Sequence, residues 1–399
     1  MKNKNPFFFI CLVWVFFFTS CANGYSDLFI SEGVDSRITQ KTSMKPFSGL
    51  AEEPIVITMP VYENKNLLGN AGFGHKVNKV GNIFVVYDCA GDAIWDWAFT
   101  EGSLGWSNWR AVRAAGKYCI SGQDGTASVL DPETGRIAVY NHGIQTWIDS
   151  YDTDGDYVLL GESSYITIDE QVQRYYAFNV RTGTLNPGCM TFHTDDASLF
   201  HPISDEDGIF WLTFAYKKNT RLIKLNPELV TCQDVGLEIP EKRDGREYEY
   251  VARVADSSSV YMTCYCYEKG GTEQKNLIFK TVDVSGSPVQ TKDWQLPVSD
   301  DWYLERFHYI DGYHCYIYMD IDDFSKTTIY KCHYDENQCI VDEQKAVSID
   351  FTEQTYARNS RIYLLNSRNS RVFTYLYYDT ATGEASTAKT YTFNDIVKL

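Results

Sequence analysis

One short pattern recurs seven times along the chain and limits the possible folds more than any other feature. In each copy a strand-like run ends in Asp or Asn, at Asp88, Asp131, Asn179, Asn226, Asp283, Asp335 and Asp379. Such a side chain can accept a hydrogen bond from the backbone N–H two residues on and so close a turn. Successive copies lie 43 to 57 residues apart, a period typical of propellers with one four-stranded blade per repeat.

Glycine follows the turn residue in five of the seven copies. We expect a positive φ, which a bulged hairpin turn needs, at Gly91, Gly135, Gly183, Gly286 and Gly383. The fourth and sixth copies lack this glycine. Asn337 can replace it in the sixth copy, whereas the fourth copy, NPELVT from Asn226, predicts a different turn.

The segments between the turns read as strands. Aromatic and β-branched runs bounded by Gly, Asp and Ser precede each copy, and no long stretch of helical period competes with them. Residues 49–399 are too many for one compact hydrophobic core. A closed ring of sheets avoids the need for such a core, because each sheet packs against its neighbours. We predict an all-β propeller, most simply of seven four-stranded blades. The run Glu52–Tyr62 supplies the first strand or the strand that closes the ring; as part of a complete degenerate blade it would make the count eight.

The N-terminus predicts export. Lys2 and Lys4 precede an apolar run, Phe7–Phe18, which is shorter than the roughly 20 residues of a membrane-spanning helix and typical of a secretory signal. The following Thr-Ser-Cys resembles the lipobox of bacterial lipoproteins, which implies that Cys21 is acylated; the alternative is an ordinary signal peptide with an incidental cysteine. Ala22 then favours the outer membrane. We expect a signal peptide at 1–20, a flexible tether at 21–48 and the propeller at 49–399.

Charge and cysteine content exclude several classes. The formal net charge is -17, and loss of a signal containing Lys2 and Lys4 makes it more negative, which argues against nucleic acid or an anionic membrane surface as a partner. The cysteines form no CxxC pair, so no zinc site is expected. Cys332 and Cys339 flank a tight turn and are either a cross-strand disulfide or reduced. The acidic run Asp149–Asp156 lacks the bidentate Glu of a calcium loop, and we expect no metal.

The copy KYCISGQDGTASVLDPETGRIAVY, at residues 117–140, carries the most specific motif. Its Gln-Asp-Gly turn at Gln123–Gly125, its Leu130-Asp131 and its Thr134-Gly135 resemble the repeat of quinoprotein-like (PQQ-repeat) propellers. With the lipobox, this resemblance implies a propeller lipoprotein of a Gram-negative, Bacteroidetes-type envelope. The quinone-dependent members pair adjacent cysteines at the cofactor and often carry haem; this chain has neither a Cys-Cys pair nor CxxCH, so we expect no cofactor.

Candidate site residues lie on the six segments expected to line the central channel. These segments are residues 108–116, 146–155, 199–208, 249–257, 304–312 and 355–360. The candidate ligand-binding residues are Trp109, Arg110, Trp147, Asp149, His201, Tyr250, Arg253, Arg306, His308 and Arg358. One interpretation is a channel that concentrates positive potential and binds an anionic group. The other is that the aromatic residues pack between blades while the arginines pair with Asp149, Glu305 and Asp311.

The sequence favours a non-catalytic binding or scaffold protein at the outer membrane, on its periplasmic face or the cell surface, with a protein or glycan partner. The long loops Ser163–Gln173, Glu238–Glu247, Glu268–Lys275 and Asp320–Lys326 are its expected working surface. No common catalytic motif is present. The alternative is a lyase or hydrolase of acidic glycans. Its arginines Arg253 and Arg306 would neutralise charge, and His201, His308 or Tyr250 would transfer protons.

Overall fold

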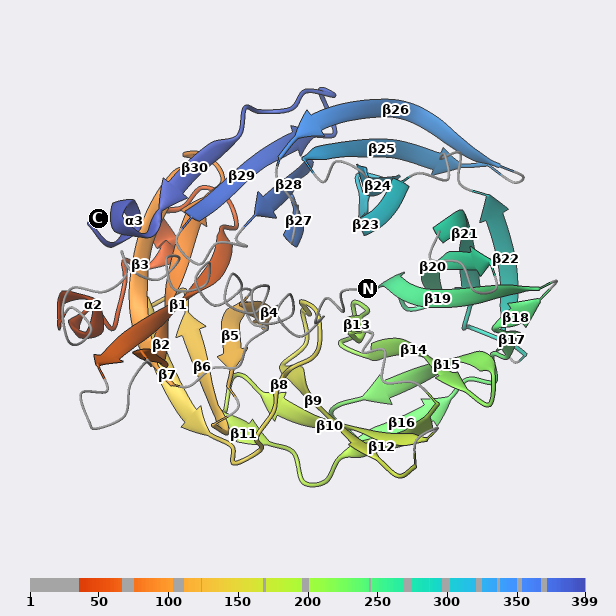
Figure 1. Cartoon of the computed structure of the whole chain (residues 1–399), viewed down its shortest axis with the longest axis horizontal. Coiled ribbons are helices and arrows are strands. Elements are labelled where there is room, and N and C mark those ends of the chain that lie inside the picture. Colours follow the sequence, from red (N-terminus) through yellow and green to blue (C-terminus); the bar gives the residue numbers. More distant parts are fainter. Residues whose placement is uncertain are drawn as a thin grey trace, which may run out of the picture.

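The computed structural model shows seven antiparallel sheets arranged as blades around a centre (Figure 1). It describes residues 36–66, 75–102, 111–122, 124–167, 170–195, 201–243, 245–268, 274–286, 288–295, 302–320, 325–335, 338–349, 354–366 and 372–398. The all-β, seven-bladed prediction is confirmed, and the count is seven rather than eight. Within the described ranges no helix is long and apolar enough to cross a membrane. The expected signal peptide and Cys21 lie outside these ranges.

The first four blades run in chain order around the ring. Blade 1 contains β1 (Ile55–Asn66), β2 (His75–Asp88) and β3 (Ala93–Glu101). Blade 2 contains β4 (Val112–Ala114), β5 (Lys117–Ser121), β6 (Thr126–Asp131) and β7 (Arg136–Asn141). Blade 3 contains β8 (Trp147–Ile148), β9 (Tyr157–Tyr165), β10 (Gln171–Asn179), β11 (Thr184–Leu185) and β12 (Met190–Thr194). Blade 4 contains β13 (Ile203–Ser204), β14 (Phe210–Tyr216), β15 (Asn219–Asn226), β16 (Thr231–Asp234) and β17 (Ile239–Pro240).

The last three blades complete the ring. Blade 5 contains β18 (Lys242–Arg243), β19 (Arg246–Ala255), β20 (Ser259–Glu268), β21 (Gln274–Asp283) and β22 (Gln290–Gln295). Blade 6 contains β23 (Trp302–Ile310), β24 (Tyr313–Asp320), β25 (Lys326–Tyr334) and β26 (Cys339–Ser348). Blade 7 contains β27 (Gln354–Arg358), β28 (Arg361–Asn366), β29 (Val372–Asp379) and β30 (Lys389–Thr392). All six predicted channel segments supply a strand at the inner side of a blade, namely β4, β8, β13, β19, β23 and β27.

The recurring Asp or Asn closes a turn in every copy. Five of these side chains accept from the N–H two residues on, at 2.9 to 3.0 Å, namely Asp88, Asp131, Asn179, Asp283 and Asp379. Asn226 and Asp335 accept from the N–H three residues on, at 3.0 and 2.8 Å, as Asn179 and Asp379 also do, at 3.0 Å. Asn226 and Asp335 belong to the two copies without the glycine. The predicted turn chemistry is therefore confirmed.

The positive φ of the turn lies four residues after the Asp or Asn. It falls on Asp92 (φ 53), Gly135 (φ 67), Gly183 (φ 72), Val230 (φ 52) and Gly383 (φ 73). The expectation was therefore wrong for Gly91 and Gly286, which do not have a positive φ. The segment NPELVT keeps a left-handed residue, Val230, at the position that glycine holds in other copies. A β-branched residue is strained there. The turn of this segment nevertheless differs, as predicted, because the Asn226 side chain accepts from Leu229, three residues on.

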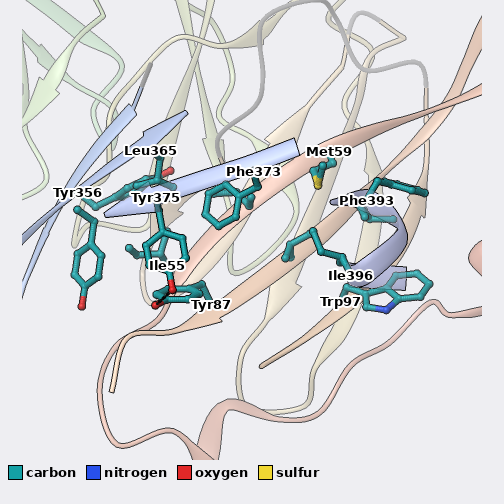
Figure 2. Close-up of a cluster of buried hydrophobic side chains, with 14 of the residues drawn as sticks. Ile55, Met59, Tyr87, Trp97, Tyr356, Leu365, Phe373, Tyr375, Phe393 and Ile396 are labelled. Atoms are coloured by element: carbon teal, nitrogen blue, oxygen red, sulfur yellow. Dashed lines mark hydrogen bonds between the residues drawn. The ribbon is translucent and has the colours of Figure 1, made fainter. Parts of the chain in front are cut away.

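The ring closes where blade 7 meets blade 1. Buried side chains from both ends of the chain form one hydrophobic cluster, and the short helix α3 (Phe393–Val397) adds Phe393 and Ile396 to it (Figure 2). At its edge, the hydroxyls of Tyr87 and Tyr375 lie 2.5 Å apart. Burial and this hydrogen bond raise the pKa of Tyr87, which keeps its proton in place.

Asp92 ties the same two blades together. Its carboxylate accepts a hydrogen bond from Tyr375 at 2.8 Å and contacts Tyr87 and the ammonium group of Lys389. The backbone oxygen of Asp92 also accepts from Lys389, at 3.1 Å. Because β30 carries Lys389, the C-terminal strand is tied to the first blade by polar contacts as well as by apolar packing.

Part of the expected tether packs against the propeller. The segment from α2 (Ser36–Gln40) to η2 (Phe47–Gly49) covers the outer strand of blade 1 and reaches blade 2. Phe99 in β3 donates its N–H to the oxygen of Lys41, and Met44 donates to the oxygen of Gly135. Met44 is buried. Residues 36–48, expected as tether, therefore belong to the packed body, because this segment covers a strand edge that would otherwise be exposed.

Cys332 and Cys339 are free thiols. Cys332 is buried on β25, and Cys339 packs against the same hydrophobic cluster from the start of β26. The hydrogen bond from Cys332 lowers the pKa of Cys339.

Candidate functional site

A cavity of about 300 Å³ lies at the centre of the ring, against blades 3 to 7. Its lining comes from the inner strands and the residues beside them: Tyr151, Asp152, Ile203, Ser204, Arg253, Val254, Ala255, Arg306, Phe307, His308, Tyr309, Thr355, Tyr356, Ala357 and Arg358. Three guanidinium groups and one carboxylate are among these side chains. In a chain of net charge -17, this is a local concentration of positive charge.

The cavity lies near one end of the channel. Tyr309 and its neighbours on β23 lie next to the turn that leads into β24, since Ile310 pairs with Tyr313. At the other end of the same strand, Trp302 pairs with Asp320, where the loop Asp320–Lys326 begins. In blade 5 the same argument applies, because Arg246 pairs with Glu268 and Ala255 with Val260. The cavity is therefore at the opposite end of the inner strands from the long loops expected as the working surface.

Hydrogen bonds across the inner strands hold the polar side chains of the cavity in place. Nε2 of His308 lies 2.6 Å from Oγ1 of Thr355, which connects blades 6 and 7. Nε of Arg253 donates to Oγ1 of Thr263 at 2.9 Å, within blade 5. A side chain that is already oriented loses less entropy when it binds a ligand.

A network of ion pairs joins the first, second, third and last blades at the centre. Blade 1 has no strand at the inner position within the described residues, because β2 ends at Asp88 and so corresponds to the third strand of the other blades. Glu53, just before β1, lies there instead. Its carboxylate pairs with Arg113 of β4 at 2.5 Å and Arg358 of β27 at 3.6 Å. Asp152 pairs with Arg358 at 3.5 Å and accepts from the N–H of Arg113 at 3.0 Å.

Arg113 acts as the hub of this network. Besides Glu53, it pairs with Asp154 at 2.5 Å. Partial burial alone would lower its pKa, but the hydrogen bond to Asp154 and the charge of Glu53 outweigh this and raise it. Arg113 is therefore a fixed cation that joins blade 2 to blade 3 and to the segment before β1. Arg358, with its side chain 17% exposed, belongs to both the network and the cavity.

His201 and Asp149 form a hydrogen-bonded pair beside the cavity. Nδ1 of His201 donates to Oδ1 of Asp149 at 2.6 Å, and Asp149 is 1% exposed. The His201 side chain is 48% exposed, and its ring meets the edge of Tyr151, which lines the cavity. Partial desolvation opposes protonation of the ring, but the hydrogen bond and charge of Asp149 raise the pKa of His201. Since Nδ1 is bound to Asp149, Nε2 is the ring atom that can act on a ligand.

The structure brings together six of the ten predicted ligand-binding residues. Arg253, Arg306, His308 and Arg358 line the cavity, and Asp149 and His201 form the pair beside it.

Of the other four predicted residues, Tyr250 is placed away from the cavity, and the side chains of three lie outside the described part of the structure. Tyr250 is 1% exposed and packs in the hydrophobic core of blades 4 and 5, with the ammonium group of Lys280 over its ring. Its assignment to the channel is therefore wrong, because its side chain packs between blades 4 and 5. Trp147 lies on β8. Trp109 and Arg110 lie outside the described residues.

For Arg358 the carboxylate partners differ from the predicted ones, of which the side chain of Glu305 lies outside the described part of the structure. Asp149 pairs with His201, and Asp311 accepts a hydrogen bond from Thr380 at 2.9 Å. Glu53 and Asp152 are the carboxylates that meet Arg358. Tyr250 and Tyr356 do pack in hydrophobic clusters, as the packing interpretation predicted.

Sequence reasoning missed Tyr309, Arg113, Asp152 and Glu53. The first three lie in the predicted channel segments, but the prediction favoured charged or imidazole groups one to three residues after an aromatic residue. The residues that reach the centre instead lie near the turn that ends the inner strand. Glu53 carried no signal, since it occupies a position where the other blades have a strand.

No group of three or more His, Cys, Asp or Glu side chains that could hold a metal ion occurs in the described ranges. In the oxygen-rich segment Asp149–Asp156, Asp149 binds His201 and Asp154 binds Arg113. These carboxylates form pairs with His201 and Arg113 and are not gathered around a common metal position.

The sequence matches no protein-family model and no curated protein. Solved structures with a similar fold include a proposed 6-phosphogluconolactonase from Bacteroides fragilis NCTC 9343, with 10% identity, a TM-score of 0.48, and coverage of 85% of this chain and 95% of that one. Saccharomyces cerevisiae Sqt1 has 11% identity and a TM-score of 0.47, covering 87% and 88%. A Synechocystis apocarotenoid oxygenase mutant has 8% identity and a TM-score of 0.46, covering 88% and 90%. At this level of likeness, function has to be argued from the site.

Proposed function

We propose that this protein is a non-catalytic binding protein whose cavity at the centre of the ring holds an anionic ligand. The observation that carries the proposal is the convergence of Arg253, Arg306 and Arg358 from three neighbouring inner strands on one cavity. Guanidinium groups bind carboxylate, sulfate and phosphate through paired hydrogen bonds. The volume of about 300 Å³ is at the lower end of small-molecule sites, roughly 300–1,000 Å³, so the ligand is small or is one unit of a polymer.

The cavity proposal is tested by calorimetric titration of the purified full-length chain with small carboxylates and sulfates. Arg253→Gln is expected to weaken binding about tenfold or more, since a charge-assisted hydrogen bond contributes about 1.5–3 kcal/mol. Arg181→Gln is the matched control, because Arg181 pairs with Asp156 at an exposed turn of blade 3 and should not affect binding. Binding that is equally strong in the Arg253 variant contradicts the proposal.

The second part of the proposal is that the protein is lipid-anchored in a Gram-negative, Bacteroidetes-type outer membrane and that its quinoprotein-like repeat is architectural. Its support is the sequence: Lys2 and Lys4, the apolar run Phe7–Phe18, and Cys21 after two small residues. The partner would be a protein or glycan of the envelope. Labelling cells with a radioactive fatty acid tests the anchor. Cys21→Ser should abolish the label while Cys119→Ser, a change in a buried cysteine of β5, should keep it.

A second candidate function is favoured by the pair of His201 and Asp149. A histidine oriented by a buried carboxylate is the arrangement that general acid–base catalysis uses. The alternative is therefore a lyase or hydrolase of acidic glycans, with His201 transferring the proton and Arg253 and Arg306 neutralising charge. Mass spectrometry of acidic oligosaccharides after incubation decides between the two. Cleavage that is lost in His201→Gln supports the enzyme, and intact oligosaccharide with measurable binding supports the binding protein.

A further inference from the structure

An exposed aromatic side chain lies in the wall of the cavity. The large hydrophobic residues that are exposed among the described residues are Val139, Tyr165, Ile166, Leu229 and Tyr309. Of these, only Tyr309 lines the cavity, and it is 54% exposed. An exposed ring at this place is available to a ligand rather than to the core.

Packing from two blades holds the ring of Tyr309 in position. It is nearly parallel to Tyr261 of blade 5, with centroids 6.5 Å apart and an interplanar angle of 10°. His314 of blade 6 approaches it at 5.0 Å, and Phe307 in turn stacks on His314 at 5.5 Å. Burial lowers the pKa of His314 to about 4, so this ring is neutral at pH 7 and behaves as part of the aromatic layer. The outer surface of Tyr309 is therefore a platform whose backing is already in place.

Polar and cationic groups line the same cavity as the platform. Arg306 and His308 are on the same strand, β23, and Arg253 is on the neighbouring inner strand β19. The hydroxyl-bearing residues Ser204 and Thr355 also line the cavity. The site thus combines one aromatic face, hydroxyl groups and guanidinium groups within a volume suited to a small ligand.

This combination matches a sugar better than a simple anion. A small carboxylate or sulfate would meet the arginines and leave the aromatic face in water. A pyranose ring has an apolar face of C–H groups that packs on an aromatic ring, and hydroxyls that pair with polar side chains. A carboxylate or sulfate on that sugar would then reach the guanidinium groups.

We propose that the ligand is an acidic glycan, one sugar unit of which stacks on Tyr309 while its carboxylate or sulfate is bound by Arg253 and Arg306. This inference rests on the proposed anion-binding function and names its ligand class. Tyr309 sets the preference for sugars over other anions, and the arginines set the preference for charged over neutral sugars.

The test is calorimetric titration of the full-length chain with four probes. They are a uronic-acid trisaccharide, a sulfated trisaccharide, the neutral trisaccharide of the same linkage, and tricarballylate, a sugar-free tricarboxylate. The first two distinguish the source of the negative charge. The variants are Tyr309→Ala, the conservative Tyr309→Phe and the control Tyr165→Ala, which removes a tyrosine that is 72% exposed and does not line the cavity.

We expect at least one acidic trisaccharide to bind more tightly than tricarballylate and than the neutral trisaccharide. Tyr309→Ala should weaken it about tenfold, the effect of losing one aromatic contact, while leaving tricarballylate binding unchanged. Tyr309→Phe and Tyr165→Ala should bind as the parent chain does. The sugar inference is overturned if tricarballylate binds as tightly as the glycans, or if Tyr309→Ala does not weaken glycan binding. Either result still supports the anion site. Absence of binding to every anionic probe overturns both.

Discussion

Two sides of the ring use aromatic side chains in opposite ways. Where blade 7 meets blade 1, the hydroxyls of Tyr87 and Tyr375 share a carboxylate, Asp92, which also holds Lys389 (Figure 2 shows the two tyrosines). Across the channel, in blades 5 and 6, Tyr309 is exposed at the cavity and is backed by the neutral ring of His314. The closing side pairs its polar groups within the protein, and the cavity side presents them at a cavity wall.

We infer from this difference that the closing side mainly stabilises the fold and that the cavity side mainly binds ligand. A closed propeller has to hold its last blade against its first, so the contacts there serve the fold. The cavity side can place charged and aromatic groups at its surface because the ring is closed elsewhere. Changes on the closing side should therefore act on unfolding, and changes on the cavity side should act on binding or on the pH dependence of stability.

Acid should weaken the cavity side most. The pKa of His314 is lowered from 6.5 to about 4 by burial, so the unfolded chain binds a proton in this pH range and the folded chain does not. The stability contributed by the neutral ring is fully present above pH 6.5 and is lost as the pH falls towards 4. The loss is about 3 kcal/mol in the free energy of unfolding.

Denaturant unfolding between pH 4 and 7 checks this prediction. His314→Phe keeps an apolar ring and should remove that part of the pH dependence. His201 contributes in the opposite direction. Its pKa is raised, so its contribution is present below the unfolded value of 6.5 and is lost as the pH rises through its folded pKa. An identical acid loss in His314→Phe would assign the effect to other groups.

Asp92→Asn should have the next largest effect, on the closing side. It removes the charge that Lys389 meets and weakens the acceptor for Tyr375, so we expect a loss of about 2 kcal/mol in the free energy of unfolding. Ligand affinity should be unchanged. Asp156→Asn is the control, since Asp156 forms an exposed pair with Arg181 and should cost less than about 1 kcal/mol. A fall in affinity in Asp92→Asn would mean that the two sides are coupled.

Glu53→Gln tests the boundary between the two sides. Loss of its charge leaves Arg113 with Asp154 and Arg358 with Asp152, so the cost in unfolding should be about 1 kcal/mol. The cavity gains net positive charge through Arg358, and anion affinity should rise about threefold at low salt. Calorimetry at two salt concentrations measures this gain. An unchanged affinity would place Arg358 wholly in the ion-pair network.

Val230→Asn should have the smallest effect, and it is a gain. Blade 7 places Gly383 at the left-handed turn position and blade 4 places Val230 there. Asn tolerates that conformation, which relieves about 1 kcal/mol of strain. The loss of a partly buried valine offsets about half of this. Thermal unfolding should show a net stabilisation of about 0.5 kcal/mol, whereas Val139→Asn, at an exposed position of β7, should show none.

The turns and blades could be predicted from the sequence because they depend on local chemistry. A side chain of Asp or Asn and an N–H two or three residues on lie within one turn, so their meeting needs no tertiary contact. The six inner strands were found for the same reason, since each directly precedes the turn-opened strand it pairs with. In five of the turns the residue with a positive φ lies four residues after the Asp or Asn. This residue is the expected glycine in three of them, and Asp or Val in the other two.

The set of residues that line the cavity could not be predicted from the sequence, because these residues come from different blades. The packing of neighbouring blades decides which side chains of an inner strand face the centre. On β19, Arg253 lines the cavity whereas Tyr250 is buried in a hydrophobic cluster. The placement of Glu53 at the centre depended on a blade that lacks an inner strand in the described residues. The sequence by itself determined the repeat, its turns and the ring. Only the closed ring decided which charges are paired with one another and which line the cavity, because those distances span blades that are far apart along the chain.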